Sequence, residues 1–136
     1  MIQSVDSVSL AKEISRQAVM HEKTMDVLIE VNIGDEESKT GLDSALLEDT
    51  IYQISEMKNI RIKGLMTIPP ICEEKELNRY FSKMHQMFVD IKGKKIDNVS
   101  MDILSMGMSS DFEVAIEEGS TIVRIGTAIF GARQYV

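Results

Sequence analysis

Three features near the C-terminus combine the residue types of an anion-binding pocket. A turn of small residues, 107–110, follows one apolar run, and Gly126-Thr127 follows another. Arg124 lies between them in a stretch of β-branched residues. Small residues let backbone N–H groups approach an anion, and the first turn of a helix attracts negative charge. A guanidinium in an apolar strand needs a carboxylate, a carbonyl group or a ligand as its partner. Together these features predict a pocket for a phosphorylated ring.

Each feature also has a purely structural explanation. Arg124 could form an ion pair with one of the 22 acidic residues, and the turn 107–110 could simply shape and cap a helix. Residues 110–113 match a capping box, and Gly119 stands where a helix C-cap favours glycine. The pairing of two such turns around one arginine favours a ligand, because the carboxyl ends of parallel strands are where ligands bind.

The elements that must position these residues alternate between strand and helix along the chain. Short β-branched runs predict strands at 1–5, 27–33, 60–68, 101–106 and 121–126. Segments with helical spacing lie between them, at 8–20, 43–57, 77–91 and 111–118. This order predicts an α/β fold of parallel β/α units in one domain, residues 1–136. Five strands make an open sheet or part of a barrel, so the chain is either a compact five-stranded domain or a piece of something larger.

Composition excludes several classes of function. The formal charge is −7, and no basic run is long enough to follow a nucleic-acid backbone. No apolar run reaches the roughly 20 residues of a membrane-spanning helix, and residues 1–6 lack the pattern of a signal peptide. Cys72 is the only cysteine, which leaves no disulfide framework or metal-ligand cluster and fits a cytoplasmic setting. His21 and His85 have no evident nucleophile or second ligand near them, so we expect no catalytic residue and no metal site.

The C-terminal block resembles the signature of the YggS/PROSC-type pyridoxal-phosphate homeostasis proteins. The residues that carry this resemblance are 105–113, 115–121, 123–127 and 129–133. It continues upstream through 4–6, 31–32, 36–42 and 63–69, and so covers nearly the whole chain.

The resemblance implies a TIM-type (β/α)8 barrel similar to the N-terminal domain of alanine racemase, of which this chain would supply the C-terminal five strands. It also implies that pyridoxal 5′-phosphate binds at the carboxyl ends of the strands. Ser109 and the backbone of Gly126 and Thr127 would hold the phosphate with Met108 beside them, and Arg124 would face the pyridine nitrogen. Because arginine cannot accept a proton, that nitrogen would stay unprotonated and the cofactor would be a weak electron sink.

One residue of the family pattern has no counterpart here. The family forms its Schiff base through a lysine on the first barrel strand, and this sequence begins at what would be the fourth strand. None of Lys12, Lys23, Lys39, Lys58 and Lys63 stands where the family places that residue. We therefore expect the chain to be a C-terminal fragment that has most of the phosphate site and no covalent anchor.

The function implied by the resemblance is binding of pyridoxal phosphate for intracellular homeostasis, without catalysis. Enzymes that depend on the cofactor would be the partners that receive it. One alternative is an amino-acid racemase-like or decarboxylase enzyme, which needs the lysine and an acid–base pair on opposite ring faces. The other is a phosphate-binding α/β module that does not use pyridoxal phosphate.

Overall fold

The computed structural model describes residues 1–35 and 40–132 of the chain. The strands are β1 (Ile2–Val5), β2 (Met25–Asn32), β3 (Leu42–Asp43), β4 (Ile60–Met66), β5 (Val99–Met108) and β6 (Ile122–Arg124). The helices are α1 (Val8–Met20), the short 3-10 helix η1 (Ser44–Leu46), α2 (Leu47–Ser55), α3 (Glu74–Lys94), α4 (Phe112–Glu117) and α5 (Thr127–Phe130). Strand and helix alternate along almost the whole described chain, as the residue pattern predicts.

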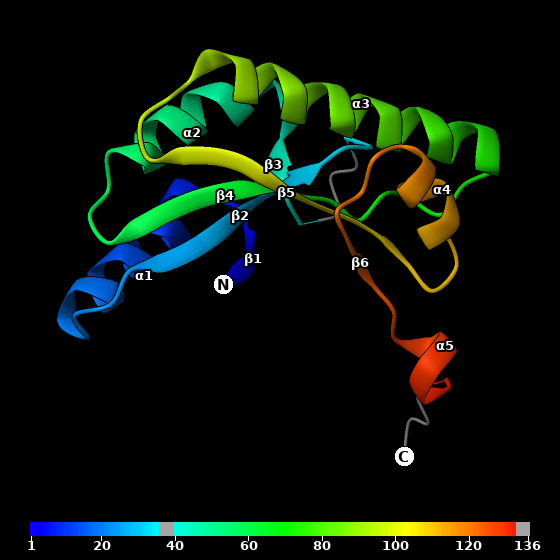
Figure 1. Cartoon of the computed structure of the whole chain (residues 1–136), viewed down its shortest axis with the longest axis horizontal. Helices are drawn as coiled ribbons and strands as arrows, with labels where there is room; N and C mark the ends of the chain where they lie inside the picture. Colours follow the sequence, from blue (N-terminus) through cyan, green and yellow to red (C-terminus); the bar gives the residue numbers. More distant parts are fainter. Residues whose placement is uncertain (36–39, 133–136) are drawn as a thin grey trace.

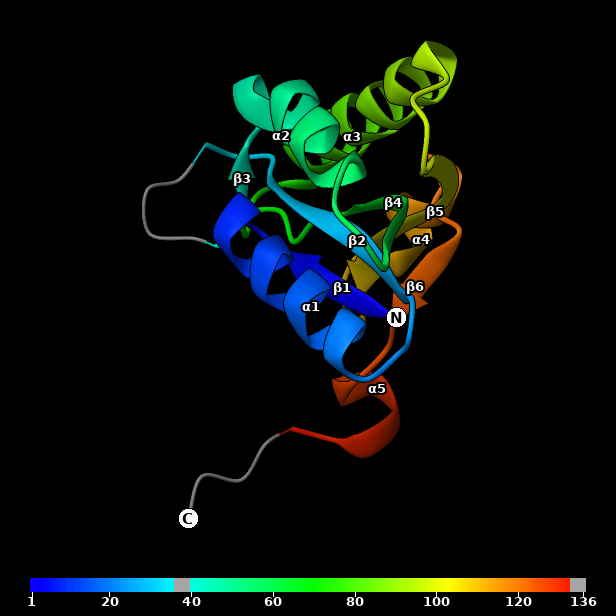
Figure 2. The same ribbon diagram turned by 90° about the vertical axis from the view of Figure 1, so that its left-hand side faces the viewer.

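All strand pairs are parallel, in the order β1-β2-β4-β5-β6, and β3 pairs with the end of β2. Helices α1 to α4 form an arc around the outside of this sheet, while α5 projects away from the body at the C-terminal end (Figures 1 and 2). In a parallel sheet the carboxyl ends of the strands share one edge, so the segments that follow β2, β4, β5 and β6 meet there.

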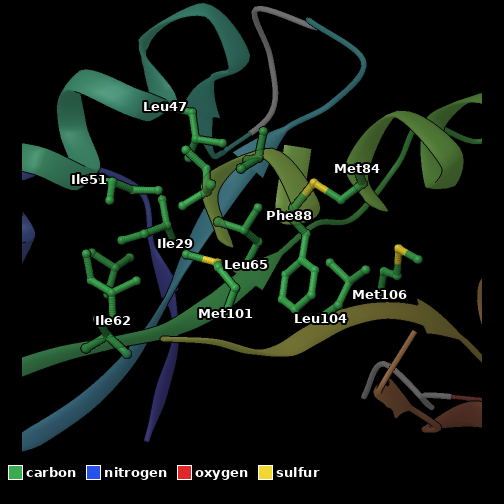
Figure 3. Packing of buried hydrophobic residues seen from close by; sticks show 14 of the residues in the cluster. Ile29, Leu47, Ile51, Ile62, Leu65, Met84, Phe88, Met101, Leu104 and Met106 are labelled. Atoms are coloured by element: carbon green, nitrogen blue, oxygen red, sulfur yellow. The ribbon is translucent and has the colours of Figure 1, made fainter. Parts of the chain in front are cut away.

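The hydrophobic core lies between the sheet and the helices (Figure 3). Alternate strand residues such as Ile29, Leu65 and Leu104 are fully buried on this side. The buried stripe of α3 consists of Phe81, Met84, Phe88 and Ile91, which recur at helical spacing and cover the sheet. Fixing the helices on one side in this way leaves the opposite side of the sheet to form the site.

The sheet is strongly curled, and one hydrogen bond demonstrates it. Ser105 Oγ on β5 donates to Gln3 Oε1 on β1 over 2.7 Å. Two strands, β2 and β4, lie between them in the sheet. In a flat sheet β1 and β5 would be roughly 14 Å apart, because neighbouring strands are spaced by about 4.8 Å. A glutamine and a serine side chain cannot span that distance, so the sheet must bend towards its own concave face.

The predicted fold class is confirmed: the parallel strands form a curled half-barrel covered by helices. The sequence did not predict β3 or α5, which have two and four residues, while η1 lies inside the helical segment predicted at 43–57. The strand predicted at 121–126, which contains Arg124, is shorter and less buried than its β-branched residues indicate. Strand β6 is only three residues long, its residues are half-buried, and it is the last strand in the order of the sheet.

No helix within residues 1–35 and 40–132 is long and apolar enough to cross a membrane.

A substitution at Gly64 tests how closely β4 and β5 pack. Its φ is +155°, and a Cβ atom there would lie 1.7 Å from the carbonyl oxygen of Ile103. The two strands shift register at this glycine. We expect Gly64→Ala to lower the free energy of unfolding by about 3 kcal/mol or more, since backbone would have to move in a packed core. Urea unfolding followed by circular dichroism measures this.

Gly93 is the matched control, because it lies in helix α3 and a Cβ atom there would meet nothing within 4 Å. Gly93→Ala should raise the free energy of unfolding by about 0.5–1 kcal/mol, through the better helix propensity of alanine. Equal effects of the two substitutions would contradict the close approach of β4 and β5.

Candidate functional site

The turn after β5 is held in shape by its own backbone and by one carboxylate. The amide of Asp111 donates to the Met108 carbonyl over 3.1 Å, and Asp111 Oδ1 accepts from the Met108 amide. Gly107 has a φ of +93°, and a Cβ atom there would lie 2.5 Å from the Cβ of Ala115, so glycine lets α4 pack closely against β5. The result is a rigid turn with Ser109 at its centre.

The predicted capping box at residues 110–113 is wrong. The N-cap residue of α4 is Asp111, and its side chain makes no capping hydrogen bond within the helix. Its carboxylate bonds the Met108 amide instead and closes the turn that carries Ser109. Gly119 does adopt the positive φ, +94°, that was expected of it after the helix.

Ser109 Oγ is the meeting point of two backbone amides. The Gly126 amide donates to it over 3.1 Å and the Ala128 amide over 3.2 Å. Both amides belong to the segment after β6, at the start of α5. Two N–H groups that converge on one oxygen are the donor arrangement that an oxygen of a phosphate group requires.

Arg124 is held on the concave face by two neutral oxygens. Its Nη1 group donates to Ser105 Oγ over 2.7 Å, and its Nη2 group donates to the Thr67 carbonyl over 3.0 Å. Ser105 and Thr67 are both fully buried. The register of β5 and β6 pairs Arg124 with Met108, which immediately precedes Ser109. The guanidinium and the Ser109 turn are therefore on adjacent strands at the same edge of the sheet.

The charge of Arg124 is not neutralised by direct pairing. Among the ion pairs of the described residues, none includes Arg124. Burial lowers the pKa of its guanidinium, and the negative charges of Asp111 and Glu30 partly oppose that effect. Glu30 is itself buried, and Thr40 Oγ1 donates to its Oε1 over 2.7 Å. The structural explanation of Arg124 as half of an ion pair is thus not what these residues show.

The structure places the predicted site residues as follows. Ser109 and Gly126 are in direct contact, and Thr127 begins α5 beside them. Met108 is 41% exposed and its amide is engaged by Asp111, so its backbone does not donate into the site. Arg124 lies one strand from Ser109. Lys39, one of the lysines compared with the family pattern, lies outside the described residues.

Four partners in the site were not among the predicted residues: Gln3, Thr67, Ser105 and Ala128. Gln3 is about a hundred positions from Ser105, so no local pattern relates them. Ala128 contributes only an amide, which its residue type does not reveal. Ser105 had a usable signal, because a serine inside a buried strand must find hydrogen-bond partners.

The donor set fits a phosphorylated aromatic ring. Two amides and a hydroxyl gather at the end of β5, and a guanidinium that donates to two neutral oxygens among the described residues lies on the neighbouring strand. Gly126 leaves open space at this point, since a Cβ atom there would meet nothing within 4 Å. Within residues 1–35 and 40–132, no group of three or more His, Cys, Asp or Glu side chains is placed to hold a metal ion.

Comparisons with known proteins identify the family and the fold. A family model described as "Alanine racemase, N-terminal domain" matches residues 1–134. The chain is 46% identical over 136 residues to the pyridoxal phosphate homeostasis protein of Aquifex aeolicus (strain VF5), and 42% identical over 132 residues to that of Escherichia coli (strain K12). The match covers 99% of this chain and 59% of the first relative, and 97% and 56% for the second.

A solved structure is similar in fold as well. PipY of Synechococcus elongatus PCC7942, with PLP bound, matches with a TM-score of 0.85 and 31% identity, over 96% of this chain and 60% of the PipY chain. The resemblance found in the C-terminal block is therefore confirmed, and this chain spans less than two thirds of the length of these relatives.

Ser109→Ala tests the junction between the turn and α5. Without the hydroxyl, the amides of Gly126 and Ala128 lose their shared acceptor. We expect hydrogen exchange of these two amides to accelerate by roughly fivefold or more, since one hydrogen bond contributes about 1 kcal/mol. Ser110→Ala, at the exposed neighbouring position, should leave both rates within about twofold. Equal exchange rates in wild type and Ser109→Ala would contradict the junction.

Proposed function

This chain belongs to the alanine racemase N-terminal domain family, and from that premise we propose that it binds pyridoxal 5′-phosphate at the carboxyl ends of β5 and β6. The observation that carries the proposal is the convergence of the Gly126 and Ala128 amides on Ser109 Oγ, one strand away from Arg124, which donates to two neutral oxygens of the described residues. Relatives named pyridoxal phosphate homeostasis proteins, and a PipY structure with PLP bound, support the choice of this ligand.

In this proposal each site residue has one task. Ser109 and the backbone of Gly126 and Thr127 hold the phosphate, together with the Ala128 amide. Met108 lines the same edge of the sheet through its exposed side chain. Arg124 directs free N–H groups towards the pyridine nitrogen.

The proposed role of Arg124 sets what the protein does with its ligand. When bound, pyridoxal phosphate supplies an aldehyde that reacts with amines and a ring that can withdraw electrons. A guanidinium donates hydrogen bonds and cannot give up its proton, so Arg124 keeps the ring nitrogen unprotonated and limits that withdrawal. We therefore propose retention and delivery of the cofactor without catalysis, which is the role expressed in the names of the relatives.

The wider setting follows from the same proposal. Residues 1–136 act as one cofactor-binding domain, and the recipients of the cofactor are enzymes that require it. A cytoplasmic location fits a chain with one cysteine, Cys72, which leaves no internal disulfide. Because the relatives are longer than this chain, these statements about the activity and partners of the whole protein belong to the proposal.

Binding of pyridoxine 5′-phosphate tests the site without aldehyde chemistry. This ligand keeps the phosphate and the pyridine ring but cannot react with lysines. We expect saturable binding by fluorescence titration, and binding of pyridoxine, which lacks the phosphate, to be at least about 100-fold weaker. Arg124→Ala and Ser109→Ala should each weaken binding of the phosphorylated ligand, by about tenfold and about fivefold.

Arg61→Ala is the matched control for loss of a guanidinium. Arg61 lies on β4 and forms an exposed ion pair with Asp26, so its removal should change the affinity by less than about twofold. Unchanged binding in both site variants, or equal affinity for pyridoxine with and without phosphate, would refute the assignment. Binding of inorganic phosphate as tightly as the vitamer would instead favour a general phosphate-binding module.

A further inference from the structure

A continuous chain of hydrogen bonds runs across the concave face from β1 to β6. Gln3 Oε1 accepts from Ser105 Oγ over 2.7 Å, and Ser105 Oγ accepts from Arg124 Nη1 over 2.7 Å. Ser105 has no exposed surface, while Gln3 and Arg124 are half-buried. None of these contacts is local, since the partners come from the first, fifth and last strands of the fold.

The direction of each hydrogen bond is fixed by chemistry. A guanidinium only donates, so Ser105 Oγ must act as the acceptor for Arg124. The single hydroxyl hydrogen of Ser105 is then free to point at one acceptor, and that acceptor is the amide oxygen of Gln3. If the Gln3 amide were turned round, Ser105 would receive two donors and its own hydrogen would have no acceptor at Gln3. The orientation of Gln3 therefore determines the orientation of the Ser105 hydroxyl.

The second anchor of Arg124 is part of the backbone. Its Nη2 group donates to the Thr67 carbonyl. Thr67 is fixed in turn by two hydrogen bonds: its amide donates to the Ser105 carbonyl over 3.1 Å, and its hydroxyl donates to the Val31 carbonyl over 2.7 Å. Because a guanidinium is planar, two anchored nitrogens and the attachment of the group through Nε together define its plane. The acceptor at the first anchor is a side-chain hydroxyl, that of Ser105, whereas the acceptor at the second is the Thr67 backbone carbonyl.

We propose that Gln3 and Ser105 are positioning residues that set the plane of Arg124 and thereby the selectivity of the site for an aromatic ring with an acceptor nitrogen. This inference rests on the proposed function, since it concerns the same ligand site. It adds two residues to the proposed site, Gln3 on β1 and Ser105 on β5. Their side chains meet because the sheet is curled, so recognition of the ring depends on that curl. Arg124 has five N–H groups, and the two anchors occupy two of them. The plane fixed by these anchors decides where the remaining three point.

A pair of ligands that differ at one ring atom tests this inference. The first is pyridoxine 5′-phosphate, and the second is its 1-deaza analogue, in which a C–H group replaces the ring nitrogen. Wild type should bind the pyridine at least about tenfold more tightly than the analogue, the size expected for one hydrogen bond to a charged group. Gln3→Met, which removes the acceptor and keeps the length of the side chain, should reduce this preference to about threefold or less.

A purely structural role would not change the preference between the ligands. In Gln3→Met and Ser105→Ala the affinity for the 1-deaza analogue should stay within about twofold of wild type, while the affinity for the pyridine falls. The double variant should lose no more selectivity than the larger of the single losses, because both residues act through one chain of contacts. Equal weakening of both ligands would overturn the positioning role.

Two further variants keep the test decisive if a substitution affects folding. Gln3→Glu preserves an oxygen acceptor for Ser105 and should keep the preference above about fivefold. Gln53→Met makes the same change as Gln3→Met at an exposed position on α2 and should have no effect. If wild type binds both ligands with a clear preference for the pyridine and Gln3→Met keeps that preference, then Gln3 does not orient Arg124 through Ser105. The positioning role is refuted in that case, and the proposed function stays intact. Wild type that binds neither ligand refutes both proposals.

Discussion

Gln3 and Ser105 are separated by two intervening strands, and their side chains nevertheless meet because the parallel sheet is curled. The curl follows from covering one side of a twisted sheet with the arc of helices α1 to α4. It gives the uncovered side a concave face on which side chains from distant strands converge. The position of Arg124 depends on this convergence, since its anchors come from β5 and from the residue after β4. The ligand-facing geometry is thus a property of the whole sheet.

The way in which Arg124 is held also fits the anionic ligand that we propose for this acidic protein. A carboxylate paired directly with Arg124 would neutralise it, whereas the Ser105 hydroxyl and the Thr67 carbonyl fix its geometry and leave its charge available. The formal net charge of the chain is −7, but exposed charges beyond about 8 Å are largely screened at physiological ionic strength. Local donors therefore dominate over the net charge. Burial lowers the pKa of the Arg124 guanidinium, and the negative charges of Asp111 and Glu30 partly oppose that effect.

The sequence allowed the parallel β/α order to be predicted, because β-branched runs and helical stripes such as that of α3 have different periods. It also singled out Ser109, Gly126 and Arg124, whose neighbours are small residues or β-branched apolar ones. The chain of hydrogen bonds from Gln3 through Ser105 to Arg124 could not be predicted. It depends on the curl of the sheet and on a contact between Gln3 and Ser105, which are 102 positions apart. The misassigned capping box has a local cause. The predicted N-cap was Ser110, but the helix begins one residue later with Asp111 as its N-cap, and the Asp111 carboxylate bonds the turn before it. Ser and Asp both favour the N-cap position, so the sequence pattern does not decide between them.

In the proposed site, Ser109 keeps the ligand-free protein stable. Two converging amides without an acceptor would destabilise the protein, and the Ser109 hydroxyl satisfies both of them. In our proposal a phosphate oxygen takes over these amides and replaces a neutral acceptor with a charged one, and charge-assisted hydrogen bonds are roughly twice as strong. The displaced hydroxyl would then donate its hydrogen to the phosphate. On this proposal the affinity is the free-energy difference between amides bound to Ser109 and amides bound to phosphate, so it would depend on the phosphate charge, while Arg124 and the residues that orient it would discriminate between rings.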